Sequence, residues 1–378
     1  MSGHRVSMSW PALAMLLLTM LAAPAVRGAD TFLSLGVDPN QPQILVTVEY
    51  LSYQELMQPE VIAFVKKYHL LVAPVIRAEL LNDDLDRLCT AYEQAGLKLV
   101  FWPLLPREDC LYLNEQSADA YLRHLDRIYA WADAHHHKVE ALIVDIEPPN
   151  CQKGSDQAPE ELAEGQSAFS LKGITKMLNK TEFDAAVPKF EAVLAKLHEH
   201  GTVAISTAMD YAAVDLATGR PVLQDLSGGP SQIVNWDYYS YMSFGSNDTA
   251  FFQDLLKKTG LKWTADDTRY LTYIIGRVIA GKFGNRAAVS LGQTIPGEGH
   301  GAIWTDPADL GKDAAAYKAA GVIHFGVYDF EGIIKAADPD AWVLAVRDTP
   351  PAVPKKSPQA VFVWRVIRAL SWVGQTKR

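Results

Sequence analysis

Two carboxylates lie two residues apart at the end of one apolar run. Residues 141–149 read ALIVDIEPP, in which Asp145 and Glu147 follow four apolar residues and precede two prolines. The run has the length and β-branched content of a buried strand, and the prolines end it because they cannot donate to a sheet ladder. Side chains alternate along a strand, so Asp145 and Glu147 share one face. Ionising both carboxyl groups there is unfavourable, and we expect one of them to keep a proton near neutral pH, as a general acid requires.

The strand that holds this pair is one of eight predicted strands, each a nearly continuous apolar run. They cover residues 44–50, 70–76, 98–105, 141–147, 202–209, 233–242, 287–293 and 322–328. Amphipathic stretches with helical periodicity lie between them, at residues 53–68, 83–94, 118–135, 183–200, 248–258, 266–280, 309–320 and 342–346. The long stretch 148–180 after the fourth strand is predicted to be a functional loop at one end of the fold.

Strands and helices that alternate in this way predict a single (β/α)8 TIM barrel, which we place at residues 30–348. The competing α/β architecture is a doubly wound open sheet. That fold usually has a glycine-rich turn after its first strand, whereas residues 50–53 here read YLSY.

In a TIM barrel the C-terminal ends of all strands meet at one mouth, where active sites lie. Besides Asp145 and Glu147, the predicted strands end near Glu49, Tyr50, Arg77, Trp102, Asp210, Tyr211, Tyr239, Tyr241, Gln293, Tyr328, Asp329 and Glu331. Carboxylates carry out glycosidic acid–base chemistry, and aromatic faces stack on sugar rings. The residues predicted to bind a carbohydrate are Glu49, Tyr50, Trp102, Asp210, Tyr239, Tyr328, Asp329 and Glu331, although aromatic residues at a barrel rim also serve as packing.

Three of these segments resemble family 18 glycoside hydrolases, the chitinases and endo-N-acetylglucosaminidases. Their fourth strand ends in D-x-x-D-x-D-x-E, and Glu147 falls on the proton-donating Glu and Asp145 on the Asp before it. Glu140 and Ile143 stand where the family has its other two Asp residues. In the sixth strand Tyr241 matches the Tyr of the family's M-x-Y-D, with Met242 in place of the Asp. In the eighth, FGVYDFEG, Tyr328 stands in place of the floor Trp.

The resemblance implies a mechanism in which the substrate's own 2-acetamido oxygen attacks the anomeric carbon. Glu147 would protonate the leaving oxygen, Asp145 would orient the acetamide, and Tyr241 would donate a hydrogen bond to it. The predicted function is a glycoside hydrolase acting on a polysaccharide or glycan, with N-acetylhexosamine substrates among the candidates. No cofactor and no metal is expected.

Three other functions stay open. A retaining glycosidase would need a second carboxylate, for which Asp210, Glu298 and Glu331 are available, although Ile146 stands where such enzymes carry Asn before the Glu. The substituted Asp positions favour a non-catalytic, lectin-like barrel, whereas the retained Glu147 favours an enzyme. A structural protein of the cell envelope, tethered by the C-terminal helix, is the third alternative.

The two ends of the chain differ from the barrel. Residues 1–28 have a weakly positive start, an apolar run and small residues at their end, which predicts a signal peptide and a secreted, periplasmic or cell-envelope protein; an uncleaved anchor is the alternative. Residues 349–359 read as a Pro-rich linker, and residues 360–378 as a basic amphipathic helix containing Arg365 and Arg368. That helix is expected either to contact a membrane surface or to dock on the barrel.

Composition sets the remaining expectations. The net charge is -9 and the barrel region shows no basic patch, so a nucleic-acid partner is not expected. Cys110 and Cys151 each follow a predicted strand at the same end of the fold, and we predict a disulfide between them, with three free thiols as the alternative; Cys89 is predicted to be a buried thiol. The run of histidines at 135–137 is interpreted as a solvated helix end and not as a metal site.

Overall fold

A computed structural model describes residues 42–149, 151, 178–295 and 301–377 of the chain. The predicted signal peptide at residues 1–28 and the candidate Glu298 lie outside the described residues, as does most of the long stretch after the fourth strand.

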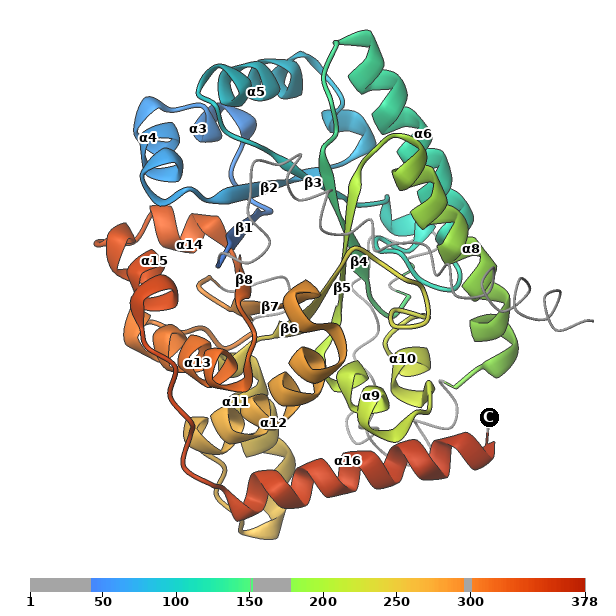
Figure 1. The fold of residues 1–378 in the computed structure, drawn as a ribbon, viewed down its shortest axis with the longest axis vertical. Coiled ribbons are helices and arrows are strands. Elements are labelled where there is room, and N and C mark those ends of the chain that lie inside the picture. Colours follow the sequence, from blue (N-terminus) through green and yellow to red (C-terminus); the bar gives the residue numbers. More distant parts are fainter. Residues whose placement is uncertain (1–41, 150, 152–177, 296–300, 378) are drawn as a thin grey trace, which may run out of the picture.

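Eight parallel strands close into one barrel in sequence order, which confirms the predicted TIM barrel (Figure 1). The barrel closes between the first and last strands, where Leu45 pairs with Gly326. The strands are β1 Ile44–Val48, β2 Leu71–Ile76, β3 Val100–Pro103, β4 Ala141–Ile146, β5 Val203–Met209, β6 Tyr238–Ser243, β7 Ala287–Gly292 and β8 His324–Tyr328. The sixth strand therefore begins five residues later than the predicted 233, because residues 231–237 form turns and irregular structure before it.

Helices surround the barrel (Figure 1). They are α3 Tyr53–Leu56, α4 Pro59–Tyr68, α5 Asp83–Gln94, α6 Ala118–Ala134, α8 Lys180–Glu199, α9 Val214–Thr218, α10 Val222–Leu226, α11 Gly245–Leu256, α12 Ala265–Phe283, α13 Pro307–Ala320, α14 Phe330–Ile334, α15 Pro339–Asp348 and α16 Pro358–Lys377. The predicted single helix at 53–68 is two helices, because Pro59 occupies the first turn of a new helix, where its missing N–H is not needed.

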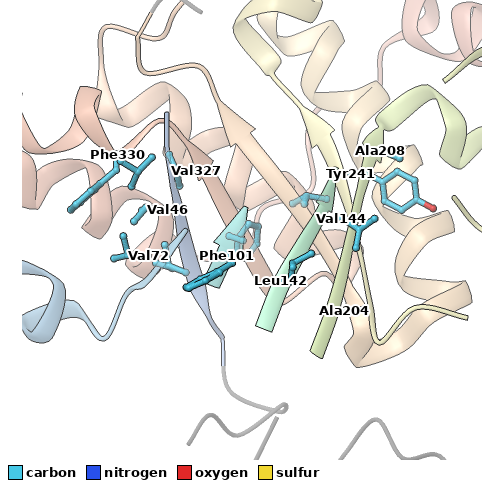
Figure 2. Packing of buried hydrophobic residues seen from close by; sticks show 14 of the residues in the cluster. Val46, Val72, Phe101, Leu142, Val144, Ala204, Ala208, Tyr241, Val327 and Phe330 are labelled. Carbon is cyan, nitrogen blue, oxygen red and sulfur yellow. The ribbon is translucent and has the colours of Figure 1, made fainter. Parts of the chain in front are cut away.

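The strands bury both faces, and their alternation separates two cores. Ile143, Ile205 and Tyr238 point into the barrel. Leu142 and Val144 belong to the larger core between the barrel and the helices (Figure 2). This alternation decides which side chains at the strand ends reach the mouth of the barrel.

Helix α16 docks on the barrel, one of the two alternatives expected for this segment. It packs against α9, α10 and α12 along one edge of the molecule (Figure 1). Ser371 on its buried face donates to Asp215 at 3.3 Å, and Trp372 receives the guanidinium of Arg220 over its ring at 3.5 Å. Among the described residues, no helix is both long enough and apolar enough to span a membrane.

The expectations for the cysteines and for the histidine run have different outcomes. Cys110 and Cys151 are joined in a disulfide, and Cys89 is a buried thiol. The interpretation of the histidine run as solvated is wrong for His137, whose side chain is only 6% exposed and bridges Asp86 at 2.7 Å and Glu93 at 3.0 Å.

A buried ion network ties α12 to α13. Arg269 lies 3.0 Å from Asp313, 2.9 Å from Asp309 and 3.1 Å from Asp266. Burial raises the pKa of Asp313 to about 6, while Arg269 acts to lower it. Arg269 is therefore the charge that compensates the most deeply buried carboxylate of the group.

We predict that Arg269→Leu lowers the free energy of unfolding by about 3–5 kcal/mol at pH 8, because it leaves Asp313 buried without its partner. Without Arg269 the pKa of Asp313 in the folded state rises further above its unfolded value, so stability is lost as pH rises and the defect is smaller at pH 5, where Asp313 is protonated. Urea unfolding at both pH values measures this. The exposed Lys312→Leu, which also removes a partner of Asp309, is the control, with an expected change within about 1 kcal/mol. Equal losses for Arg269→Leu at the two pH values would contradict the prediction.

Candidate active site

A cavity of about 640 Å³ opens at the C-terminal ends of the strands. Five carboxylates line it: Glu49, Asp145, Glu147, Asp210 and Asp248. Of the described residues in its wall, none is Lys, Arg or His. A site with this charge disfavours anionic ligands.

The backbone around the central pair is held by a neighbouring loop. Asp145 is 2% exposed and lies on the inner face of β4, while Glu147 follows the last strand residue and is partly buried. The N–H of Leu113 donates to the carbonyl of Asp145 at 2.9 Å, and the N–H of Glu147 donates to the carbonyl of Leu113 at 3.3 Å. These two bonds extend the edge of the barrel past β4 and fix the direction in which Glu147 leaves the strand.

Gly228 packs directly on the backbone of Glu147. Its φ is +99°, and a Cβ atom there would lie 2.2 Å from the carbonyl oxygen of Glu147. The carbonyl of Gly228 accepts from the N–H of Glu115 at 3.0 Å. A residue without a side chain is therefore required where this loop touches Glu147.

Aromatic side chains donate hydrogen bonds to two of the carboxylates. The indole N–H of Trp102 donates to Asp145 Oδ2 at 3.1 Å, and Tyr328 Oη donates to Glu49 Oε2 at 2.6 Å. The hydroxyl of Tyr50 lies 3.3 Å from that of Tyr328. Asp145 Oδ1 is buried and has no hydrogen-bond partner among the described residues.

Burial and mutual repulsion favour the protonated forms of the central pair. Burial raises the pKa of Asp145; the hydrogen bond from Trp102 opposes this shift, and the Glu49 carboxylate adds to it. Burial also raises the pKa of Glu147 well above the ordinary carboxyl range, with further contributions from Asp145 and Glu49. The pair can thus keep a proton at neutral pH, as the sequence predicts for a general acid.

A second carboxylate pair lies at the ends of β5 and β6. Burial raises the pKa of Asp210, opposed by hydrogen bonds from the Tyr211 backbone and from Ser243. Burial and the proximity of Asp210 raise the pKa of Asp248. These two carboxyl groups therefore also favour a shared proton.

Most of the residues predicted from the strand ends line the cavity. They are Glu49, Tyr50, Trp102, Asp145, Glu147, Asp210, Tyr211, Gln293 and Tyr328; Arg77 does not line it. Asn247 and Asp248 also line the cavity and were not predicted; they lie in the first turn of α11, which follows β6. They lie five and six residues beyond Met242, where the predicted sixth strand ends.

Two tyrosines of β6 are placed elsewhere, and their predicted roles are wrong. Tyr241 is 1% exposed and points away from the barrel interior into the core beneath the helices (Figure 2). Tyr239 stacks on Phe283 at 3.8 Å between ring centroids and donates to the carbonyl of Val234 at 2.9 Å. Strand alternation is the reason, because the inner face of β6 presents Tyr238, Ser240 and Met242.

Asp329 and Glu331 do not line the cavity either, so substrate contact is the wrong role for them. Asp329 is fully buried, caps α14 by accepting from the N–H of Glu331 at 2.6 Å, and accepts from the N–H of Glu49 at 2.8 Å. Glu331 pairs with Lys335 at 2.9 Å. Asp329 therefore holds the backbone of Glu49 at the end of β1, and it is Glu49 that lines the cavity.

No metal site is evident among the described residues, where no three His, Cys, Asp or Glu side chains are grouped to hold an ion. Asn247 Oδ1 and Gln293 Oε1 are buried acceptors in the cavity wall that, like Asp145 Oδ1, lack a hydrogen-bond partner within the described part of the chain. Buried acceptors of this kind favour a ligand that brings hydrogen-bond donors.

We predict that Gly228→Ala lowers the free energy of unfolding by about 3 kcal/mol, because the added Cβ overlaps the Glu147 carbonyl as well as straining a positive φ. The matched control is Gly219→Ala, where φ is +68° and nothing lies within 4 Å of the added Cβ. Its loss should be only about 1 kcal/mol, from backbone strain alone. Chemical denaturation measures both, and a crystal structure of Gly228→Ala should show Glu147 displaced. Equal losses with Glu147 unmoved would contradict the role given to Gly228.

No protein-family model matches the chain, and no curated protein sequence does either. Solved structures do match it. The glycoside hydrolase domain of PgaB (BpsB) from Bordetella bronchiseptica is 12% identical with a TM-score of 0.46, and the match covers 81% of this chain and 99% of that one. Chitinase ChiC from Aspergillus fumigatus is 11% identical with a TM-score of 0.39, covering 88% and 100%. The 3-keto-D-glucoside 4-epimerase YcjR from E. coli is 13% identical with a TM-score of 0.40, covering 86% and 100%. At these identities the matches concern the barrel fold alone.

Proposed function

We propose that this protein hydrolyses a glycosidic bond in a neutral carbohydrate, with Glu147 as the proton donor. The observation that carries the proposal is the placement of Glu147, whose pKa is raised by burial and by Asp145, in a cavity that also holds Trp102 and Tyr328. The buried acceptors without partners among the described residues suit the hydroxyl groups of a sugar.

The chemistry follows from the protonation states. Glu147 donates its proton to the glycosidic oxygen as the bond to the anomeric carbon breaks, and the nearby Asp145 and Glu49 stabilise the positive charge that develops on the sugar ring. Water then adds to the anomeric carbon and returns a proton to Glu147. Among the described residues, no cation lines the cavity to oppose that positive charge.

The position of Tyr241 bears on how the second step occurs. Because Tyr241 lies outside the cavity, it cannot be the acetamide donor that the family 18 resemblance implies, which weakens the case for substrate assistance. Among the alternative second carboxylates that the structure describes, Glu331 lies outside the cavity wall, whereas Asp210 lines it. We therefore infer that Asp210 is the better candidate for the second carboxylate.

A non-catalytic carbohydrate-binding barrel is the second candidate. Ile143 and Met242, which replace Asp residues of the resembled family, both point into the barrel next to Asp145. An apolar inner face beneath the carboxylates supports binding without turnover. For either function, the disulfide between Cys110 and Cys151 supports the proposal that the protein is exported, since disulfides persist in oxidising compartments.

The test is hydrolysis of a panel of aryl glycosides, including N-acetylglucosamine oligomers, by the wild-type protein and by Glu147→Gln and Asp210→Asn. Loss of at least about 10²-fold in kcat/KM on Glu147→Gln is expected, because the proton donor is removed. Loss on Asp210→Asn with every substrate supports a second carboxylate, while activity restricted to N-acetylated sugars supports substrate assistance. Absence of turnover together with sugar binding that Glu147→Gln leaves unchanged would establish the binding-only alternative.

The alkaline limb of the activity profile should depend on Glu49. Activity requires protonated Glu147, so it falls as pH rises through the pKa of Glu147. Because the Glu49 carboxylate raises that pKa, Glu49→Gln should lower it and move the alkaline limb of kcat/KM to lower pH. Glu331→Gln makes the same change in charge outside the cavity and should leave the limb in place. A limb that does not move in Glu49→Gln would show that another group sets it.

A further inference from the structure

The cavity has a second half that the proposed reaction does not use. Beyond the carboxylates, its wall is built from apolar side chains of three helices: Phe252, Leu255 and Leu256 of α11, Leu271 and Ile275 of α12, and Val363, Val366, Ile367 and Leu370 of α16. Both halves belong to one continuous cavity. A ligand that fills it must therefore be polar at one end and apolar along the rest.

The apolar half has an exposed rim. Leu255 is 45% exposed, Phe362 59% and Val366 40%, and all three line the cavity. Leu255 comes from α11 and the other two from α16, so apolar side chains of two helices that are distant in the sequence gather at one opening. Apolar surface concentrated in this way marks a binding site, whereas single exposed apolar residues do not.

Positive charge accompanies this rim on α16. Arg365 and Arg368 are exposed on the same helix, and the exposed Lys355 and Lys356 precede it. The chain as a whole has a net charge of -9, so this concentration of cations is local. Exposed apolar side chains beside cations are typical of a helix that rests on an anionic membrane surface.

From this arrangement, and on the basis of the proposed function, we propose that the substrate is a glycolipid drawn from a membrane surface. Its neutral sugar lies at Glu147, and its hydrocarbon chain lies in the groove between α11, α12 and α16. The bond between the anomeric carbon and the aglycone oxygen breaks, Glu147 protonates that oxygen so that the lipid leaves as an alcohol, and water supplies the hydroxyl of the released sugar and the proton that restores Glu147. The groove thus holds the leaving group.

The first experiment compares methyl, butyl, octyl and dodecyl glycosides of the sugar that the enzyme hydrolyses best, each below its micelle concentration. Burial of added methylene groups should raise kcat/KM by at least about tenfold from methyl to octyl. Leu255→Asn and Phe362→Asn, both at exposed positions, should reduce the octyl-to-methyl ratio of kcat/KM. Val353→Asn, at a 65% exposed apolar position outside the cavity, is the matched control and should leave the ratio unchanged. Hydrolysis with a ratio near one in the wild-type protein would overturn the inference while leaving the proposed function intact.

The second experiment tests the membrane as source. The protein is sedimented with phosphatidylcholine vesicles that contain an alkyl glycolipid, with and without phosphatidylglycerol. Binding should be stronger with phosphatidylglycerol and should weaken in the double variant Arg365→Gln/Arg368→Gln. The control is Arg123→Gln/Arg127→Gln, the same change in charge at exposed positions on α6. Equal binding to both vesicles, or equal effects of the two double variants, would overturn the membrane source.

The third measurement tests whether alkyl chains bind in the groove, independently of whether the protein hydrolyses the glycosidic bond. Glu147→Gln is titrated with alkyl thioglycosides, which are not hydrolysed, and binding is followed by calorimetry. Affinity that rises with chain length supports the groove even if no glycoside is turned over, in which case only the hydrolytic proposal fails. Affinity independent of chain length overturns the groove whatever the activity.

Discussion

The burial of two carboxyl groups at the end of β4 is the constraint around which the mouth of the barrel is built. Asp145 receives one side-chain hydrogen bond, from Trp102, and its other oxygen has no partner among the described residues. An ionised carboxylate in that position would be poorly solvated, so the energetics favour a proton held on the pair. The backbone contacts of Leu113 and Gly228 prevent the pair from relaxing outward, and the raised pKa of Glu147 is thus a property of the fold as much as of the residue.

The apolar half of the cavity contributes to the same electrostatics. Side chains of α11, α12 and α16 line the space next to the carboxylates with hydrocarbon, which cannot solvate charge. A hydrocarbon chain in that space would displace water and raise the preference for protonated Glu147 still further. The docking of α16 on α9, α10 and α12 therefore places a C-terminal segment in the wall of the cavity that holds Glu147, more than two hundred residues earlier in the chain.

The sequence predicted the barrel and the position of its mouth because each buried strand is a distinct apolar run and parallel strands end on the same side. It predicted Asp145 and Glu147 for the same reason. It could not decide which face of β6 looks inward, since residues 238–241 read YYSY and either register presents tyrosine to the interior. Asp329 was misassigned because a carboxylate at a strand end serves equally well as a substrate contact or as a helix cap, and only the N–H groups of Glu49 and Glu331 distinguish the two. The apolar wall escaped sequence analysis because helices distant in the sequence form it together.

Asp329 connects the seam where the barrel closes to the cavity carboxylates. It follows β8, the strand that pairs with β1, and it accepts the N–H of Glu49, the residue that follows β1. Tyr328 beside it donates to the carboxylate of the same Glu49. The backbone and the side chain of Glu49 are thus both held from β8, at the seam where the first and last strands meet. Because Glu49 raises the pKa of Asp145 and of Glu147, the pairing that closes the barrel also fixes the charge that keeps the proton on the pair.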